Sequence, residues 1–323
     1  MKIGSIVLGR YCVIDFLEQG GTTELFLVNK LHEHTENKEK NDCVKTNLVK
    51  GDYAILKMLR PFFRDDEELK EIFQDEIALM QLMNHRNIVK FCEQGQIERE
   101  NALILEYILG ENLAILKDTM KQKGLSFPLS CAIDMGLQLL EALDYIHGLH
   151  KNNIPLEIIH RDITPANILI RLDGTVKLSD FGIARYRKNA HQHDTDDDIR
   201  GTFAYLAPEL FDDGVIVDQR IDLFAWAVVM WELLAEQSLF KGNSPDKTLE
   251  NVRHLSIPSL QDIKPDIPDN IAQIIHKNLS RQPHDRYKNA LSTHQDLTLA
   301  YQKKWGKVER RLLSRLVCQH RIN

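Results

Sequence analysis

The sequence predicts an α+β protein of two lobes, with a β-rich N-terminal lobe and a helical C-terminal lobe. Its 323 residues suit one large two-lobed domain or two ordinary domains. Strand-like apolar runs dominate the first third of the chain, and helical periodicity dominates from Ser130 onward. The two patterns meet near Glu106–Gly110, where we expect the lobes to divide.

The first third reads as strands followed by one helix. "YCVIDFL" and "ELFLV" flank the turn-rich "EQGGTT", which predicts a hairpin, and "YAILKML" predicts a buried strand. Between them, residues 29–52 are polar and aperiodic, as in a long loop. Glu67–Asn84 has helical period, and its inward face includes a charged residue, Glu76.

The remainder adds one strand and several helices. "NALILEYI" predicts a strand and "SCAIDMGLQLLEALDYIH" an amphipathic helix. Leu223–Trp231 is apolar on all sides, which predicts a buried helix. This longest apolar run is far shorter than the roughly 20 residues that span a bilayer.

Composition narrows the class of protein. Hydrophobic residues make up 43% and charged residues 27%, a soluble globular mixture, and a net charge of −6 gives no nucleic-acid footprint. The five cysteines are scattered without disulfide or zinc-site spacing, which indicates a reducing compartment. The N-terminus does not resemble a signal peptide. We therefore expect a soluble cytoplasmic protein, and the sequence leaves export into a host cell open.

Two glycines mark a possible phosphate-binding loop in "LEQGGTTELFL". Glycine lets backbone amides approach a phosphate closely because no Cβ intervenes. The Gly-x-Gly-x-x-Gly pattern is incomplete, since Glu18 and Thr23 replace its first and third glycines and only Gly20 matches, with Gly21 beside it. Alone, such a pair is more often an ordinary turn.

Lys57 lies in an otherwise apolar strand, where a lysine is costly unless it is paired. Glu76, on the inward face of the next helix, is its natural partner. The alternative is a surface lysine whose stem runs past its apolar neighbours.

The most specific signal is "HRDITPAN" together with "LSDFGIAR", in which Asp180 follows Asn167 by 13 residues. Together with the lysine strand, these motifs resemble those of the bacterial eukaryotic-like (Hanks-type) serine/threonine protein kinases, over roughly Tyr11–Tyr301. The resemblance implies a bilobal protein kinase fold with an N-lobe at 1–107, a C-lobe at 108–301 and a basic amphipathic tail at 302–323. It also implies transfer of the ATP γ-phosphate to protein Ser/Thr hydroxyls with Mg²⁺.

The resemblance assigns roles to individual residues. Asp162 would accept the substrate hydroxyl proton, Asn167 and Asp180 would hold Mg²⁺, and Thr202 in "GTFAYLAPE" would seat a hydroxyl substrate. Lys57 would bind phosphates while Glu76 holds it. The residues implied to contact ATP are Leu17, Gly20, Gly21, Leu25, Lys57, Leu105 as gatekeeper, Glu106 and Ile108 through their backbones, Leu169 and Asp180.

Three scaffolding expectations accompany these roles. Glu209 should pair with Arg286, because a buried charge without its partner is strongly destabilising. Asp222, at the start of the buried helix, should anchor the backbone of the catalytic loop. Between Gly182 and Gly201, the acidic run around Thr195 is either an ordinary solvated loop or a partner for Arg161, in which an aspartate pairs with Arg161 directly or phosphorylated Thr195 supplies the charge.

Two other functions compete with an active kinase. A pseudokinase scaffold would bind nucleotide with little transfer, and the irregular glycine loop and Thr164 are its only support. Thr164 stands where serine/threonine kinases usually carry lysine, so we expect a working but slower enzyme in which its hydroxyl assists. A small-molecule phosphotransferase would usually lack the Ala-Pro-Glu segment that is present here.

The last 22 residues carry seven basic side chains against one glutamate. On a helical wheel Trp305, Val308, Leu312 and Leu316 share one face and the basic residues fill the other. We expect this tail to pack on its own lobe, with an acidic partner or a membrane surface as the alternative.

Overall fold

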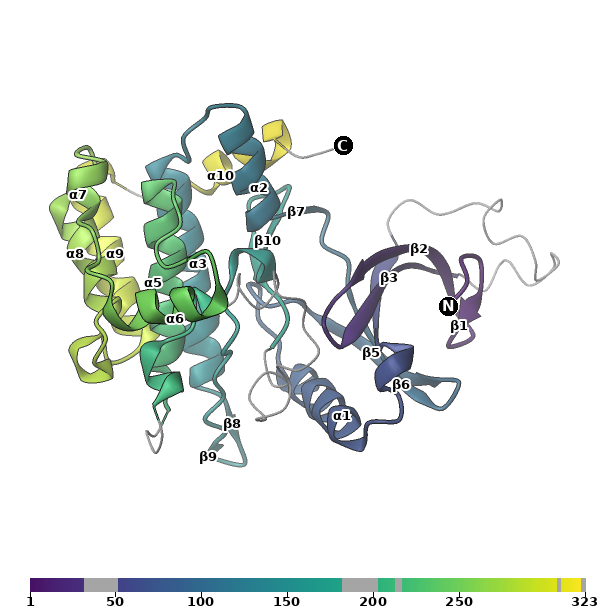
Figure 1. The fold of residues 1–323 in the computed structure, drawn as a ribbon. Helices are drawn as coiled ribbons and strands as arrows, with labels where there is room; N and C mark the ends of the chain where they lie inside the picture. The colour runs from purple at the N-terminus through teal and green to yellow at the C-terminus, as the bar shows by residue number, and fades with distance from the viewer. Residues whose placement is uncertain (32–51, 182–202, 213–216, 307–308, 321–323) are drawn as a thin grey trace. The chain divides into compact units, whose positions relative to one another are not determined.

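The computed structural model describes residues 1–31, 52–181, 203–212, 217–306 and 309–320 (Figure 1). Contacts divide these residues into two compact units. The first unit comprises 1–31, 52–84 and 89–107, and the second comprises 85–88 and the described residues from 108 onward.

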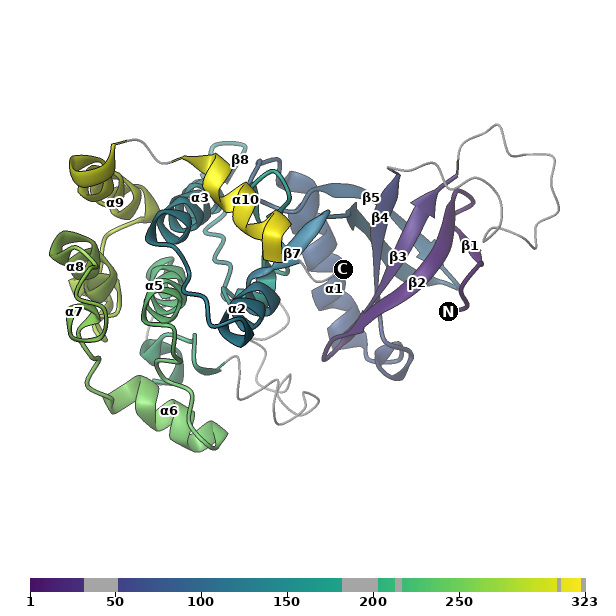
Figure 2. The ribbon, with the colours of Figure 1, turned by 90° about the horizontal axis from the view of Figure 1, so that it is seen from above.

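The first unit is built on a curved antiparallel sheet of six strands in the order β1-β2-β3-β4-β6-β5 (Figure 2). Its strands are β1 (Ile6–Val7), β2 (Tyr11–Gln19), β3 (Thr23–Lys30), β4 (Tyr53–Leu59), β5 (Phe91–Ile97) and β6 (Glu100–Glu106). β4 lies in the middle and is buried along most of its length, as the apolar "YAILKML" predicts. The predicted hairpin is therefore confirmed as β2 and β3, joined at Gly20–Thr22.

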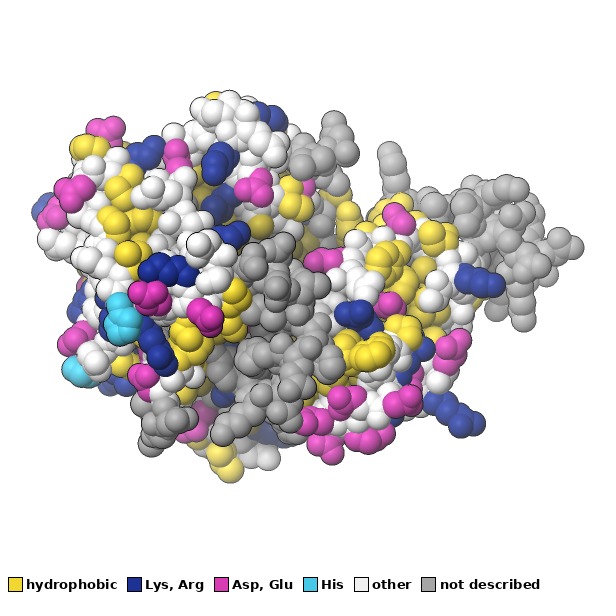
Figure 3. Space-filling view, in the orientation of Figure 1, with side chains coloured by type: hydrophobic (Ala, Val, Ile, Leu, Met, Phe, Trp, Pro, Cys, Tyr) yellow, Lys and Arg dark blue, Asp and Glu magenta, His cyan; other side chains and the backbone are white. Residues whose placement is uncertain are grey.

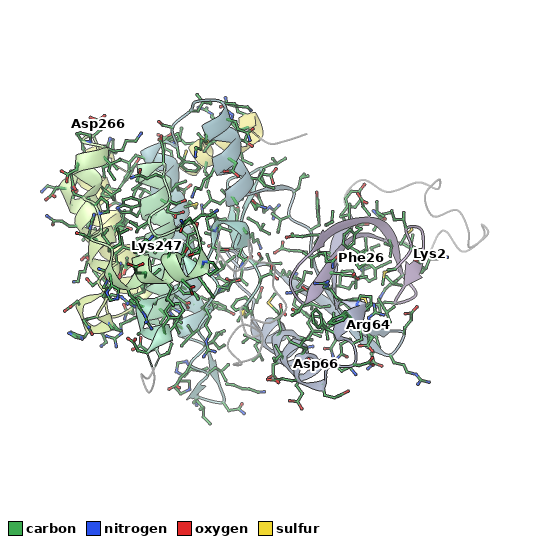
Figure 4. All side chains as sticks on the ribbon, viewed as in Figure 1. Lys2, Phe26, Arg64, Asp66, Lys247 and Asp266 are labelled. Atoms are coloured by element: carbon green, nitrogen blue, oxygen red, sulfur yellow. The ribbon has the colours of Figure 1, made fainter. Side chains whose placement is uncertain are left out.

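Helix α1 (Glu67–Leu82) follows β4 after a short 3₁₀ turn at Pro61–Phe63. It begins at Asp66, whose side chain accepts a hydrogen bond from the backbone amide of Leu69 at 3.1 Å (Figure 4). Its buried face is made of Leu69, Ile72, Phe73, Glu76, Ile77 and Met80. The helical period of the sequence thus correctly predicts a charged residue on a buried face.

The second unit is mainly helical. Its helices are α2 (Leu113–Gln122), α3 (Leu129–His147), α5 (Arg220–Ala235), α6 (Pro245–His254), α7 (Leu260–Ile263), α8 (Asp269–Asn278), α9 (Ala290–Trp305) and α10 (Arg310–His320). Helix α5 is buried on every side, as its sequence predicts. Helix α3 is buried over most of its surface as well, more fully than an amphipathic pattern predicts, because α5, α9 and α10 all pack against it.

Two small sheets complete the second unit, and the sequence did not predict them. β10 (Ile168–Arg171) pairs with both β11 (Val176–Leu178) and β7 (Gly110–Asn112). β8 (His150–Lys151) and β9 (Ile154–Pro155) form a hairpin whose turn residues, Asn152 and Asn153, have φ of 53° and 64°. Asparagine tolerates this left-handed region better than most residues do. Together with the first unit, these elements confirm the α+β class.

The tail is not one continuous helix, so the single helical wheel is wrong. Helix α9 ends at Trp305, because Gly306 takes φ 74° and ψ −149°, and α10 starts again at Arg310. Helix α10 then packs against α3 and α2 (Figure 2) and buries Leu313, Leu316 and Val317. Trp305, 39% exposed, lies on α9 instead, and Val308 lies outside the described residues.

The surface carries charges of both signs. On the face seen in Figure 3, lysine and arginine side chains alternate with aspartate and glutamate over each unit. Among the described residues, none of the helices has the length and apolarity that crossing a membrane requires.

Candidate active site

The segment that leads to Asp162 is fixed by one buried carboxylate at the start of α5. Asp222 accepts hydrogen bonds from the backbone amides of His160 and Arg161, each at 2.8 Å. Nε2 of His147, at the end of α3, lies 2.8 Å from the same carboxylate. These contacts confirm Asp222 as the anchor of the loop. They also hold Arg161 at φ 69°, a costly conformation that persists only where the surroundings impose it.

The surroundings shift the pKa values of the two ionisable groups at this anchor, Asp222 and His160. Burial alone would raise the pKa of Asp222, but its hydrogen bond with His147 and the amide of Arg161 lower it overall, so the carboxylate is charged. Burial lowers the pKa of His160 despite the nearby carboxylates, so its ring is neutral at pH 7. The anchor is therefore a charged acceptor beside a neutral ring.

Asp162 and Asn167 form the centre of the loop. The Nδ2 atom of Asn167 donates to Oδ2 of Asp162 at 2.7 Å and to its backbone carbonyl at 2.9 Å. Asp162 is only 5% exposed, and the 3₁₀ helix Pro165–Asn167 brings the amide back toward it. The result is an oriented carboxylate, which is what a general base requires.

Thr164 lies between these two residues and is itself buried, with 8% of its surface exposed. Its backbone carbonyl accepts a hydrogen bond from the amide of Asn167 at 3.1 Å. Thr202, expected to seat a hydroxyl substrate, and Thr195, a candidate phosphorylation site, both lie outside the described residues.

The segment before Asp180 is tied to the same loop. Ser179 donates to the carbonyl of Asn167 from its backbone amide at 3.0 Å and from its hydroxyl at 3.2 Å. Its own carbonyl lies 3.2 Å from Nε2 of His160, and the His160 and Phe181 rings are 4.6 Å apart. Asp180 follows at φ 54°. Asp162, Asn167 and the backbone leading to Asp180 are thus held in one hydrogen-bonded cluster.

The first unit contributes a buried ion pair. Nζ of Lys57 lies 2.7 Å from Oε1 of Glu76, and both side chains are at most 10% exposed. Lys57 stands opposite Leu25 on β3 and Leu103 on β6 in the strand register. The predicted pairing is present, and the alternative of a surface lysine is wrong.

The other residues expected to contact ATP lie in two groups. In the first unit Gly20 and Gly21 form the hairpin tip, Leu17 is 45% exposed on β2, and Leu105 is 8% exposed opposite Ile55. The backbone of Glu106 is fixed there by a bond from its amide to the carbonyl of Lys90 at 3.0 Å. In the second unit Ile108 precedes β7, and the half-buried Leu169 pairs with Asn112 and Lys177.

The second unit also contains the predicted scaffolding pair. Arg286 and Glu209 meet through two parallel hydrogen bonds of 2.6 and 2.7 Å. The sequence did not single out His147 or Ser179, whose contacts fix the loop from behind. Both are recognisable only after the fold is known, because their partners are distant in sequence.

The donor set suits a magnesium ion that is shared with a phosphorylated ligand. Among the described residues, no group of three or more His, Cys, Asp or Glu side chains is placed to hold a metal alone. Mg²⁺ in nucleotide sites is instead held by one or two protein oxygens, phosphates and water. Because Nδ2 of Asn167 is bonded to Asp162, its Oδ1 is the atom left to meet a cation.

Comparison with known proteins gives consistent results. The family model of the protein kinase domain matches residues 43–298, which leaves out the glycine-rich hairpin. A probable serine/threonine-protein kinase of Clostridium perfringens is 29% identical over 289 residues, covering 89% of this chain and 38% of the relative. The tyrosine-protein kinase MasK of Myxococcus xanthus is 28% identical over 283 residues, covering 87% of this chain and 41% of the relative. The chain thus spans about two fifths of the length of these curated relatives.

Solved structures agree on the fold. The kinase domain of Mycobacterium tuberculosis PknI superposes with a TM-score of 0.64 at 21% identity, covering 93% of this chain and 99% of that one. At this identity the likeness shows the fold alone.

Proposed function

The chain belongs to the protein kinase family, and from that premise we propose that it transfers the γ-phosphoryl group of ATP to serine or threonine hydroxyls of proteins. The observation that carries the proposal is the Asp162 carboxylate, oriented by Asn167 at 2.7 Å on a backbone that Asp222 holds. A carboxylate placed in this way accepts the proton of an attacking hydroxyl. Phosphoryl transfer otherwise needs positioning and charge compensation, which the remaining residues supply.

The charge compensation is assigned to three residues. Lys57, held by Glu76, contacts the phosphates of ATP, and Asn167 and Asp180 hold Mg²⁺ through side-chain oxygens. When bound there, Mg²⁺ would supply positive charge that offsets the charge developing on the phosphates during transfer. The backbones of Glu106 and Ile108 bind the adenine edge in this proposal. Leu17, Gly20, Gly21, Leu25, Leu105 and Leu169 form the surfaces around the nucleotide.

Serine or threonine is proposed over tyrosine because "GTFAYLAPE" has the threonine that is typical of Ser/Thr kinases. The relatives do not agree on this point, since one of them is named a tyrosine kinase. Identification of the phosphorylated amino acid is therefore part of the test.

The test uses the full chain with radiolabelled Mg-ATP and a generic protein acceptor. We expect label on serine or threonine, and at least a roughly hundredfold loss of transfer in Asp162→Asn, with nucleotide binding retained. Asp173→Asn, a more exposed aspartate of the same unit, is the matched control and should behave as the parent.

Each alternative gives a distinct outcome. Equal transfer by Asp162→Asn and the parent would show that the base is misassigned. Nucleotide binding without transfer by the parent would indicate a pseudokinase, and phosphotyrosine as the product would overturn the Ser/Thr assignment.

For the remainder of the chain, we propose that residues 1–107 and 108–301 act as the two lobes. The described cysteines are all free thiols, which supports a reducing compartment such as the cytoplasm. Residues 302–323 are proposed to belong to the second lobe, because α10 buries its apolar side chains there. The exposed side chains of Arg311 and Arg315 then leave a basic face for an acidic partner.

A further inference from the structure

Arg60, directly after β4, binds the tip of the glycine-rich hairpin through several groups at once. Its Nη1 donates to the carbonyl of Gly21 at 2.7 Å and, more weakly, to that of Gly20 at 3.4 Å. Its backbone amide donates to the carbonyl of Thr22 at 3.0 Å. With its amide oxygen turned toward the guanidinium, Gln19 accepts from Nε at 3.0 Å and Nη2 at 2.7 Å. One residue thus contacts four consecutive residues of the tip.

This hairpin has fewer glycines than a phosphate-binding loop usually has, and its tip has one short internal bond, from the Gly20 amide to the Thr23 carbonyl at 2.9 Å. Backbone carbonyl oxygens carry partial negative charge and repel an anion. Hydrogen bonds from a guanidinium are charge-assisted, so they compensate the carbonyls of Gly20 and Gly21 more strongly than neutral donors do. A tip held in this way keeps those oxygens bonded to Arg60 and away from a phosphate.

Arg60 also links the tip to the strand that carries Lys57. Lys57 lies in β4, and Arg60, three positions later, directly follows that strand. β4 pairs with β3 from Thr23↔Leu59 to Asn29↔Tyr53. The guanidinium lies 5.4 Å from the centre of the Phe63 ring, and Phe63 is 3% exposed. The hairpin tip is therefore attached through Arg60 to the buried core of the first unit.

We propose that Arg60 is a positioning residue for the phosphates of the nucleotide, holding the hairpin tip at a fixed place relative to Lys57. This inference rests on the proposed ATP binding and goes beyond it, because it assigns the order of the loop to a side chain outside the glycine pattern. The competing explanation is a staple that stabilises the hairpin without affecting nucleotide affinity.

The test compares Arg60→Ala, Arg60→Lys and Arg64→Ala in the full chain. Arg64 is a matched control, since it lies four residues on in the same unit (Figure 4), and the described contacts of its side chain, with the Leu59 carbonyl at 3.5 Å and Glu98 at 3.7 Å, do not involve the hairpin tip. Binding of ATP and of adenosine is measured directly, together with kcat and the KM for ATP.

For Arg60→Ala we expect ATP affinity to fall roughly tenfold, since about 1.4 kcal/mol of charge-assisted hydrogen bonding corresponds to that factor. KM for ATP should rise by a similar factor with kcat changed less, and adenosine affinity should stay as in the parent. Arg60→Lys, which keeps the charge but loses the planar fork, should recover part of the loss, and Arg64→Ala should match the parent.

Unchanged ATP affinity in Arg60→Ala would overturn the inference, as would equal losses for ATP and adenosine, which indicate general distortion of the unit. If Arg60→Ala does not fold, Gln19→Ala and Arg60→Lys decide, because both must weaken ATP binding and leave adenosine binding intact. A parent that binds ATP with this dependence on Arg60 but transfers no phosphate would refute the proposed activity and leave the positioning role standing.

Discussion

Among the described residues, each unit contains a buried ion pair between a basic side chain and a glutamate, and the two pairs are built differently. In the first unit Nζ of Lys57 lies 2.7 Å from Oε1 of Glu76, with side chains 7% and 10% exposed. In the second unit the guanidinium of Arg286 donates hydrogen bonds to both carboxylate oxygens of Glu209, with side chains 0% and 6% exposed. Burial is therefore similar, and the difference lies in the geometry of the cation.

The remaining contacts of Arg286 show what its geometry achieves. Nε donates to the carbonyl of Ser280 at 2.7 Å, and the Nη atoms also donate to those of Arg220 and Arg281 at 3.1 Å each. All five N–H groups are thereby used, and the guanidinium lies 4.9 Å from the centre of the Phe224 ring. A lysine ammonium is a compact charge without a fixed plane. The Arg286–Glu209 pair therefore joins separate segments of the second unit, whereas the compact ammonium of Lys57 accords with its proposed contact with a ligand.

The comparison predicts its largest effect for Arg286→Ala. Removal of the guanidinium leaves Glu209 as a buried charge without its partner, which typically costs about 3–5 kcal/mol of unfolding free energy. Urea unfolding followed by circular dichroism measures this cost. Arg171→Ala, which breaks an exposed pair with Asp173 at 3.5 Å, is the control and should cost less than about 1 kcal/mol. A loss as small as that of the control would show that the two pairs do not differ as described.

Exchanging the two cations should affect the two pairs in different ways. Lys57→Arg keeps a charge beside Glu76 but replaces a point charge by a wide planar group, so phosphoryl transfer should fall roughly a hundredfold. Arg286→Lys keeps its charge but loses the fork, so it should lower the urea midpoint while activity per folded molecule stays near that of the parent. Steady-state kinetics and urea unfolding on both variants give the two readouts. The same pattern of loss in both variants would contradict the distinction between a ligand-binding pair and a structural pair.

The Lys57–Glu76 pair could be predicted from local patterns, because Lys57 interrupts an apolar strand and Glu76 falls on the buried side of a helical period. The Glu209–Arg286 pair was instead expected from the resemblance of the Ala-Pro-Glu segment to that of protein kinases. The α+β class followed from the same periodicities, and short strands such as β8 and β9 were missed because two residues carry no period.

The residues that could not be predicted depend on contacts between distant segments. His147 reaches Asp222 only because the end of α3 meets the start of α5, and Arg60 meets Gly21 across the sheet. The prediction of a single helix in the tail was wrong for a local reason. Gly306 ends α9, and a helical wheel drawn through this glycine ignores its tendency to end helices.

The buried side chain of His160 differs from both pairs because it is held neutral. Burial lowers its pKa in the folded chain, so between the unfolded value of about 6.5 and the lower folded value only the unfolded chain binds the proton. Unfolding free energy should therefore fall as pH falls from 7.5 to 5.5, by at most about 1.4 kcal/mol per pH unit for this group.

His160→Phe removes this contribution and should flatten the dependence of the unfolding free energy on pH. His85 and His276, whose pKa values burial also lowers, titrate in both proteins and supply the background slope. Parallel curves for parent and variant would show that His160 does not contribute.

The smallest expected effect concerns Thr164, a buried neutral residue where related kinases usually carry a charge. If Lys57 and the bound Mg²⁺ supply most of the positive charge, the hydroxyl of Thr164 contributes one neutral hydrogen bond, worth about 0.5–1.5 kcal/mol. Thr164→Ala should then reduce kcat roughly two- to tenfold, far less than Asp162→Asn, and Thr164→Ser, which keeps the hydroxyl, should stay close to the parent. Initial rates at saturating Mg-ATP measure all three variants. A loss in Thr164→Ala as complete as that in Asp162→Asn would mean that the charge supplied by the Lys57 pair is not enough, and that Thr164 takes part in the transfer step itself.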